Sequence, residues 1–193
     1  METEKKNFHL GTQWLGAILI VALGAVNLLL LRQNLTLRKQ LSGGTVSNAF
    51  HGGERLDGFT GVDLNGQQLA IDFNRPGRKH IILYLSPSCP YCFQQAPLWR
   101  NLLDNLDGNR FDVVGVVSDK NEREPVARNI DELGYLKTKN PLAVMFLKDE
   151  ALAKLRFVAT PTTMIVSDTG VVEGMWVGKW KESDSNQVAA AMK

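Results

Sequence analysis

The chain has 193 residues, of which 44% are apolar and 22% charged, the composition of a foldable globular protein. Its formal net charge of +2 gives no support to a nucleic-acid partner. Two cysteines exclude a disulfide-rich scaffold, and with only three histidines elsewhere they do not supply the ligands of a structural zinc site. We therefore expect one globular domain and some additional chain, with no bound metal or other cofactor.

The first predicted element is an apolar helix over residues 10–31, LGTQWLGAILIVALGAVNLLLL, which no charged residue interrupts. A helix that spans a bilayer needs about 20 such residues, whereas the apolar core of a cleaved signal peptide has about 7–15. A helix buried in the core would need every face covered, and the remaining sequence already contains the elements of a complete domain. We expect an uncleaved transmembrane anchor behind a short tail, residues 1–9.

The orientation of this anchor is left open by its flanking charges. Two basic residues precede it and three follow it closely, which decides nothing under the positive-inside rule. Residues 32–54 first extend the helical pattern and then become rich in Gly and Ser, as in a flexible linker. A catalytic domain is expected over residues 55–193.

Within that domain, predicted strands alternate with predicted helices. Short apolar runs rich in β-favouring residues indicate the buried strands His80–Ser86, Arg110–Ser118 and Pro161–Ser167, the last continuing into a hairpin. Helical spacing and end signals indicate Phe93–Leu106, Glu124–Gly134 and Glu182–Lys193, the last capped by Ser or Asp. The alternation predicts an α/β domain with a mixed central sheet, largely parallel, flanked by helices and with an antiparallel hairpin at its edge.

Both cysteines, Cys89 and Cys92, lie in the stretch LSPSCPYCFQQAP, between a predicted strand and a predicted helix. A bridge across two residues closes too short a loop to stabilise a fold, so the pair needs a chemical explanation. The free N–H groups and the dipole at a helix start stabilise a thiolate, so we expect a lowered pKa at Cys89. Cys92 comes one turn later and is expected to be more buried. Cys89 is therefore predicted to attack a disulfide and Cys92 to resolve the mixed disulfide.

A single Cys-x-x-Cys between a buried strand and a helix resembles the active site of the thioredoxin superfamily. Pro97 stands where that family has a helix-kinking proline, and VATPTT, Val158–Thr163, resembles its cis-proline loop. The stretches 58–73 and 151–172 resemble the membrane-tethered, extracytoplasmic TlpA/ResA branch. The lead-in YLSPSCPYC is similar to that of MauD-type accessory proteins. The resemblance covers about residues 55–190.

This resemblance implies a thioredoxin-like fold and a set of site residues. Pro161 is expected to be cis, and Thr160 to present its backbone as an edge for an extended substrate segment. The resemblance also implies that four residues support the active site: Ser88, Pro90, Tyr91 and Pro97. Pro90 in addition suits the first turn of a helix, because its missing N–H would have no partner within the helix there.

The sequence departs from the family pattern at two of its positions. Ser88 replaces the tryptophan that usually precedes the first cysteine, and Leu83 replaces a buried carboxylate that aids proton transfer to the second thiol. Either another group or water then accepts that proton, or the exchange is slower than is usual in the family. Of the tryptophans, Trp99 is expected in the core, and Trp176 and Trp180 at the hairpin or surface. His80 is interpreted as a strand-end residue rather than a catalytic one.

The resemblance implies a membrane-anchored thiol–disulfide oxidoreductase, with its catalytic domain on the periplasmic side and protein thiols or disulfides as partners. The branch implies a reducing role in the maturation of extracytoplasmic proteins or metalloenzymes, fed by a membrane-bound or soluble dithiol donor; an oxidising role is a second possibility. The alternative is a tethered Cu(I) metallochaperone that uses the same two thiolates, although no His or Met flanks them. A peroxiredoxin is disfavoured because Ile82 stands where its PxxxTxxC pattern needs proline.

Overall fold

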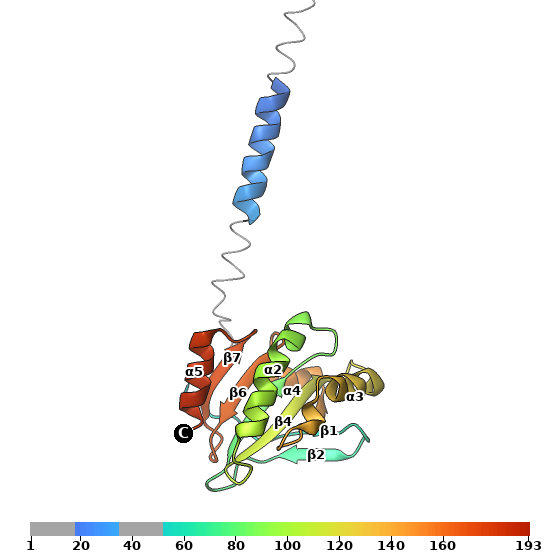
Figure 1. Cartoon of the computed structure of the whole chain (residues 1–193), viewed down its shortest axis with the longest axis vertical. Helices are drawn as coiled ribbons and strands as arrows, with labels where there is room; N and C mark the ends of the chain where they lie inside the picture. The colour runs from blue at the N-terminus through green and yellow to red at the C-terminus, as the bar shows by residue number, and fades with distance from the viewer. Residues whose placement is uncertain (1–17, 35–51) are drawn as a thin grey trace, which may run out of the picture. The chain divides into compact units, whose positions relative to one another are not determined.

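The computed structural model describes residues 18–34 and 52–193, and the chain separates into two compact units, Met1–Ser47 and Asn48–Lys193 (Figure 1). In the first unit, residues 18–34 form a helix whose residues are all exposed. Among the described residues, no helix combines the length and the apolar character needed to cross a bilayer. The tail, the start of the predicted anchor and most of the predicted linker lie outside the described residues, so the anchor remains a prediction.

The second unit is built on one sheet of seven strands in the order β2-β1-β5-β4-β3-β6-β7. The strands are β1 (Phe59–Val62), β2 (Gln68–Ile71), β3 (Lys79–Tyr84), β4 (Phe111–Ser118), β5 (Ala143–Leu147), β6 (Thr162–Val166) and β7 (Val172–Val177). Between and after them come α2 (Pro90–Asn105), α3 (Arg123–Glu132), the 3-10 turn η1 (Tyr135–Lys137), α4 (Asp149–Lys154) and α5 (Glu182–Ala191).

The sheet is mixed, as predicted, but the prediction that it is largely parallel is wrong. Only the pairs β3–β4 and β4–β5 are parallel, and all other neighbouring strands are antiparallel. The connection from β5 to β6, residues 148–161, contains the six-residue α4 and the loop with Pro161, and it does not return along the sheet. Strand β6 therefore starts at the end of the sheet where β5 stops and runs antiparallel to β3.

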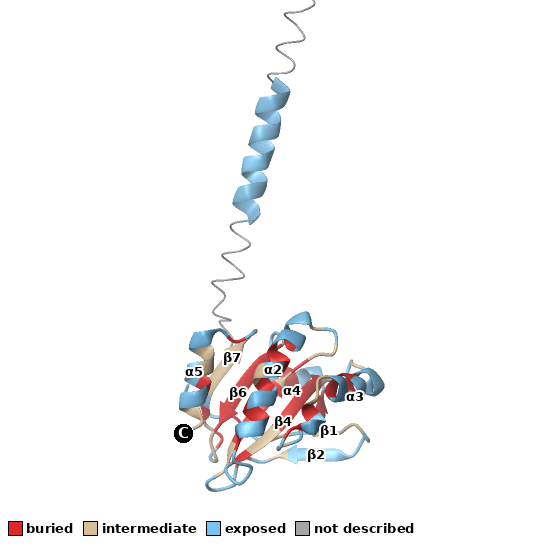
Figure 2. Ribbon diagram, in the orientation of Figure 1, coloured by how far each residue is buried: buried red, intermediate tan, exposed pale blue. Residues whose placement is uncertain are grey.

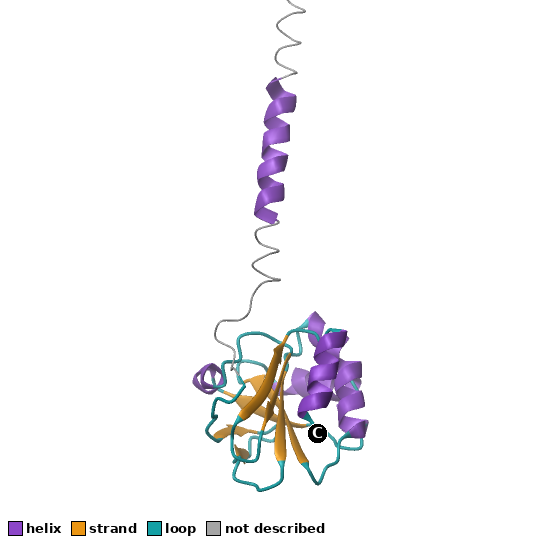
Figure 3. Ribbon diagram, turned by 90° about the vertical axis from the view of Figure 1, so that its left-hand side faces the viewer, coloured by secondary structure: helices purple, strands orange, loops and turns teal. Residues whose placement is uncertain are grey.

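Helices cover both faces of the sheet (Figure 3). On one face, α2, α3 and α5 bury an apolar cluster that includes Leu83 and Trp99. On the other face, α4 and the segment before β1 bury a second cluster that includes Ile82 and Leu155. Successive residues of β3 thus point to opposite faces, and the central strands are buried on both, as Figure 2 shows.

The helix ends follow local chemistry. Helix α3 stops before Gly134, whose φ of 73° is a left-handed conformation that glycine adopts without steric cost. The N-cap residue of α5 is Lys181 rather than the predicted Ser or Asp. The Asp184 carboxylate accepts the Lys181 backbone N–H at 2.8 Å. Strand β5 and helix α4 were not predicted from the sequence.

His80 is buried near the start of β3, as predicted for a strand-end residue. Its ring packs edge-on against Phe73 with ring centroids 5.0 Å apart. Its Nε2 has no hydrogen-bond partner among the described residues. Burial lowers the pKa of His80 below its usual value, because a charged imidazolium is poorly solvated there.

This environment predicts a pH-dependent stability. Below about pH 6.5 an unfolded chain protonates this histidine while the folded chain keeps it neutral, so the free energy of unfolding should fall as the pH drops through that range. His80→Phe should flatten this dependence in denaturant titrations between pH 5 and 8. Phe73→Leu, which loosens the packing but keeps the imidazole, should lower stability and retain the slope. An unchanged slope in His80→Phe would contradict the assignment.

Candidate active site

The two cysteines lie at the junction between β3 and α2, at the end of the sheet where β6 also begins. Cys89 is the residue that precedes the first turn of α2, and its backbone N–H donates to the Ser86 carbonyl at 3.2 Å. Cys92 lies one turn further on the same side of the helix, facing the core. Both are free thiols in this structure. The spacing therefore gives one exposed and one enclosed sulfur, as predicted.

The loop before β6 brings Thr160 to Cys89. The Cys89 thiol donates to the Thr160 backbone carbonyl at 3.3 Å, across 71 residues of sequence. The Thr160–Pro161 peptide bond is cis, as the resemblance implied. Pro161 is buried, Thr160 half-buried, and the preceding Val158 and Ala159 are exposed. The two predicted substrate-binding residues, Thr160 and Pro161, thus lie next to the Cys89 sulfur.

The Cys89 thiol is the more acidic of the two. Its partial burial raises its pKa, but hydrogen bonds from the Thr160 and Cys92 side chains and from the Cys92 and Tyr91 backbones outweigh this effect. The net pKa of Cys89 is lower than that of an ordinary cysteine. A larger fraction is therefore thiolate, the form that attacks a disulfide.

The Cys92 thiol is strongly disfavoured as a thiolate. Its side chain is 2% exposed, and burial is the main cause that raises its pKa to about 12. The neighbouring Cys89 raises this pKa further through its hydrogen bond and its charge, whereas the Ser86 backbone and the Thr160 side chain lower it. Cys92 thus stays protonated while Cys89 carries the negative charge.

Leu83 is fully buried in the apolar cluster beneath α2, so the position of the family carboxylate is apolar, as expected from the sequence. Two tyrosines lie close enough to Cys92 for a thiolate there to raise their pKa values. Tyr135 is buried, and burial raises its pKa far above its usual value, with Cys92 adding to the effect. Burial also raises the pKa of Tyr84, with contributions from Asp149 and Cys92. Both phenols therefore stay protonated at neutral pH.

Three of the four predicted support residues, Ser88, Pro90 and Tyr91, are sequence neighbours of the thiols, and Pro97 lies further along α2. Ser88 is exposed, and its hydroxyl lies 3.1 Å from that of Ser86. Pro90 is the first residue of α2, where its missing N–H leaves no bond unmade. Tyr91 is 60% exposed beside the attacking sulfur. Pro97 lies inside α2, where it removes one internal hydrogen bond of the helix.

Sequence reasoning missed the residues that hold the loop before β6. The Thr162 hydroxyl donates to the Ala159 carbonyl at 2.6 Å, and the Gly178 N–H donates to the Pro161 carbonyl at 2.7 Å. Sequence reasoning also misplaced Trp180, which is 8% exposed and belongs to the core rather than the surface. The signal available for Thr162 was its position two residues after Thr160; nothing in the sequence indicated Trp180.

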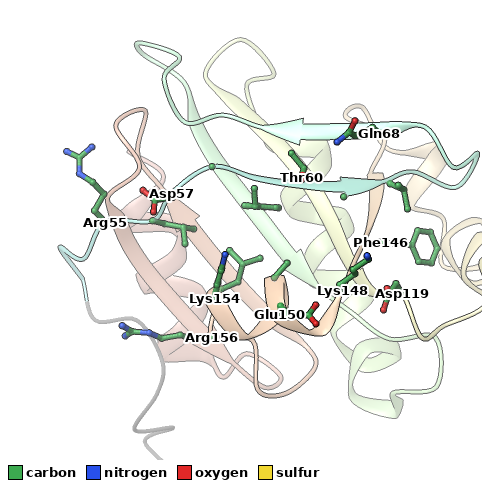
Figure 4. Close-up of a pocket in the computed structure, with 17 residues that line it drawn as sticks. Arg55, Asp57, Thr60, Gln68, Asp119, Phe146, Lys148, Glu150, Lys154 and Arg156 are labelled. Carbon is green, nitrogen blue, oxygen red and sulfur yellow. The ribbon is translucent and has the colours of Figure 1, made fainter.

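A cavity of about 1130 Å³ lies elsewhere, between the segment 55–62 and α4 (Figure 4). Its rim carries charges of both signs, including Arg55, Asp57, Glu150 and Lys154. Neither cysteine and no residue of the loop 158–161 lines it. The thiols are thus reached from the surface and not through this cavity.

A metal site would have to use the two thiols themselves. In residues 18–34 and 52–193, no group of three or more His, Cys, Asp and Glu side chains is arranged to hold a metal ion.

Solved structures of several thiol–disulfide proteins share this architecture. The thioredoxin domain of a thiol–disulfide oxidoreductase from Bacteroides vulgatus is 20% identical, with a TM-score of 0.59, covering 75% of this chain and 100% of that one. This chain has a thioredoxin-like fold. A thioredoxin-family thiol:disulfide interchange protein from Chlorobium tepidum is 19% identical, with a TM-score of 0.58 and the same two coverages. StoA from Bacillus subtilis is 18% identical, with a TM-score of 0.52, covering 70% of this chain and 96% of that one.

The sequence itself matches no protein-family model and no curated protein. Identities of 18–20% to these thioredoxin-like structures establish the fold. The activity of this chain therefore has to be argued from its own site.

The thiol environments predict selective alkylation. In the reduced full-length chain, a small alkylating reagent at neutral pH should modify Cys89 and spare Cys92 until the protein unfolds. The rate plotted against pH should have its midpoint below the pKa of an ordinary cysteine, and Thr160→Val should move this midpoint upward, whereas Thr160→Ser should not. Peptide mapping by mass spectrometry identifies the modified residue, and first modification at Cys92 would reverse the assignment.

Proposed function

We propose that this protein is a thiol–disulfide oxidoreductase that exchanges disulfides with other proteins through Cys89 and Cys92. The observation that carries the proposal is the pairing of a partly exposed Cys89 of lowered pKa, 3.3 Å from the Thr160 carbonyl, with an enclosed Cys92 one turn away. Two structures that share the fold, the thiol–disulfide oxidoreductase domain from Bacteroides vulgatus and the thiol:disulfide interchange protein from Chlorobium tepidum, support the same activity.

The exchange begins at the exposed sulfur. The Cys89 thiolate attacks one sulfur of a substrate disulfide, a new S–S bond joins Cys89 to the substrate, and the second substrate sulfur leaves as a thiolate that takes up a proton. This step removes the negative charge from Cys89. Since that charge and the hydrogen bond to Cys89 both raise the pKa of Cys92, the pKa of Cys92 falls once the mixed disulfide has formed.

The enclosed sulfur completes the reaction. Cys92 loses its proton and attacks the Cys89 sulfur, the bond to the substrate breaks, and the substrate leaves as a second thiolate. Two electrons have then passed to the substrate, and Cys89 and Cys92 share a disulfide. A dithiol donor regenerates both thiols by the same steps in reverse. With Leu83 in place of a carboxylate, water is the acceptor we assign to the Cys92 proton.

The substrates are proteins rather than small disulfides bound in a pocket. The surface next to Cys89 presents the large side chains of Tyr91, 60% exposed, and Val158, 50% exposed. The half-buried Thr160 offers its backbone as an edge on which an extended segment can lie. A segment of this kind aligns its own disulfide with the attacking sulfur.

We further propose that residues 10–31 anchor the chain in a membrane and that the catalytic domain lies on the periplasmic side. The uninterrupted apolar sequence supports the anchor, as do the large apolar side chains of residues 18–31, which are more than half exposed in the described helix. The resemblance to the TlpA/ResA branch supports the side and a reducing role in protein or metalloenzyme maturation. A Cu(I) chaperone is less well supported, since no His or Met flanks the two cysteines.

Serine variants of the two cysteines test the proposed chemistry. The full-length chain in detergent should reduce a protein disulfide when supplied with a dithiol, and Cys89→Ser should abolish this activity. Cys92→Ser should accumulate a mixed disulfide with the substrate, because the attacking thiol remains and the resolving one is gone. Non-reducing gels and intact-mass measurement detect the adduct. An adduct that accumulates in Cys89→Ser instead would exchange the two roles.

A fusion tests the topology. A reporter that is active only in the periplasm, joined after Lys193, should be active on the full chain and inactive on a chain that lacks residues 10–31. Immunoblotting controls for fusion levels. A stable but inactive fusion of the full chain would contradict the periplasmic placement, and a full chain recovered in the soluble fraction would contradict the anchor.

A further inference from the structure

One hydroxyl group in the core, that of Thr163, accepts hydrogen bonds from two indole rings. Trp99 Nε1 donates to Thr163 Oγ1 at 3.0 Å, and Trp180 Nε1 donates to the same oxygen at 3.1 Å. All three side chains are buried, with exposures of 0% for Trp99, 1% for Thr163 and 8% for Trp180. A hydroxyl oxygen has two lone pairs, so the two donors occupy both. With water excluded, each indole N–H depends on this one oxygen.

The three residues belong to three segments that frame the active site. Trp99 is in α2, the helix that starts after Cys89. Thr163 is in β6, two residues beyond Pro161. Trp180 follows β7, the strand that pairs with β6. The shared oxygen therefore ties the helix that carries both cysteines to the strand that carries the loop opposite them.

Further hydrogen bonds extend this connection toward the thiols. The Gln95 side-chain carbonyl accepts the Trp180 backbone N–H at 2.9 Å, and Gln95 is fully buried on the face of α2 that also carries Cys92. Gly178, two residues before Trp180, donates its N–H to the Pro161 carbonyl. Trp180 is thus fastened to α2 through its backbone and to β6 through its ring.

This connection is directional, whereas most of the packing of α2 on the sheet is apolar. Backbone bonds fix β6 against β3 in register, but apolar contacts alone let a helix shift on a sheet by small amounts. The Trp99–Thr163 bond joins α2 to β6 at a fixed distance and angle. A shift of α2 along β6 would change the separation of Cys89 Sγ from Thr160, whose carbonyl lies 3.3 Å away and whose side-chain hydrogen bond lowers the pKa of Cys89.

We infer that Thr163 is a positioning residue for thiol–disulfide exchange, whose hydroxyl, shared by Trp99 and Trp180, sets the placement of the Cys89 sulfur against Thr160. The inference rests on the proposed function, because it concerns the same site. Thr163 touches neither thiol in this scheme and acts through α2 and the loop before β6. Its effect should therefore appear in the reactivity of Cys89 as well as in stability.

Two substitutions separate the hydroxyl from the shape of the side chain. Thr163→Val keeps the volume and the β-branch but leaves two buried indole N–H groups without an acceptor, so the rings must move to find one. Thr163→Ser keeps the oxygen and loses only a methyl group. Thr138→Val is the matched control, since Thr138 is also buried and its hydroxyl also makes two bonds, to the Tyr135 and Asn140 carbonyls, neither of them in α2 or β6.

The experiment uses the full-length chain in detergent and measures three quantities for each variant. These are the pH midpoint of Cys89 alkylation, the rate of protein-disulfide reduction at neutral pH, and the thermal unfolding midpoint. Thr163→Val should raise the alkylation midpoint and slow exchange by about tenfold, the scale expected when a reacting group is displaced by less than 1 Å. Thr163→Ser should restore both. Thr138→Val should lower the unfolding midpoint and leave the alkylation midpoint unchanged.

The outcomes separate this inference from the proposed function. A wild-type chain that exchanges no disulfide would refute the function, while the alkylation profiles still report on the placement of Cys89. An unchanged alkylation midpoint in folded Thr163→Val, an equal defect in Thr163→Ser, or the same midpoint shift in Thr138→Val would overturn the positioning role. If Thr163→Val does not fold, Trp99→Phe and Trp180→Phe each remove one donor, and the role requires both to raise the midpoint.

Discussion

The bond between the Cys89 thiol and the Thr160 carbonyl joins segments 71 residues apart, and it exists only because both reach the same edge of the sheet. Strand β3 delivers Cys89 at its end, and antiparallel β6 starts beside it. Strand β6 runs in this direction because the segment between β5 and β6, which is α4 and the loop after it, does not return along the sheet. The contact at Cys89 thus depends on how the chain connects β5 to β6.

The contrast between the two thiols has a local origin. Three residues are close to one turn of a helix, so the cysteines share a side of α2 but differ in depth. Cys89 at the start meets free N–H groups and the surface, whereas Cys92 meets the apolar cluster. Burial then separates their pKa values, and the charge on Cys89 widens the separation. The proposed order of attack and resolution follows from this difference in depth together with the hydrogen bonds that lower the pKa of Cys89.

Features set by local sequence were predictable. The strand, the cysteine pair and the helix that follows are contiguous, so spacing and propensity placed them and indicated the deeper sulfur. Strand β5 was missed because its five residues form an uninterrupted apolar run without alternation, which periodicity cannot assign. The direction of β6 was missed because α4 is too short to leave a helical pattern.

Features that depend on distant partners were not predictable. Thr163 meets Trp99 across 64 residues and Trp180 across 17, and no spacing in the sequence indicates either pairing. Trp180 was assigned to the hairpin or the surface, because its place in the sequence does not indicate which segments pack over its ring. Only the packed positions of α2 and β7 show that its ring is enclosed.

The depth of Cys92 also determines how the oxidised form of the protein would behave. If the two sulfurs form a disulfide in this arrangement, an incoming thiol reaches only the Cys89 side of it, because Cys92 is 2% exposed. Oxidation and reduction of a partner would then pass through the same intermediate, taken in opposite order, as microscopic reversibility demands. Reversibility alone therefore sets no direction of electron flow. Whether the site reduces or oxidises a partner depends on its own reduction potential relative to that of the partner.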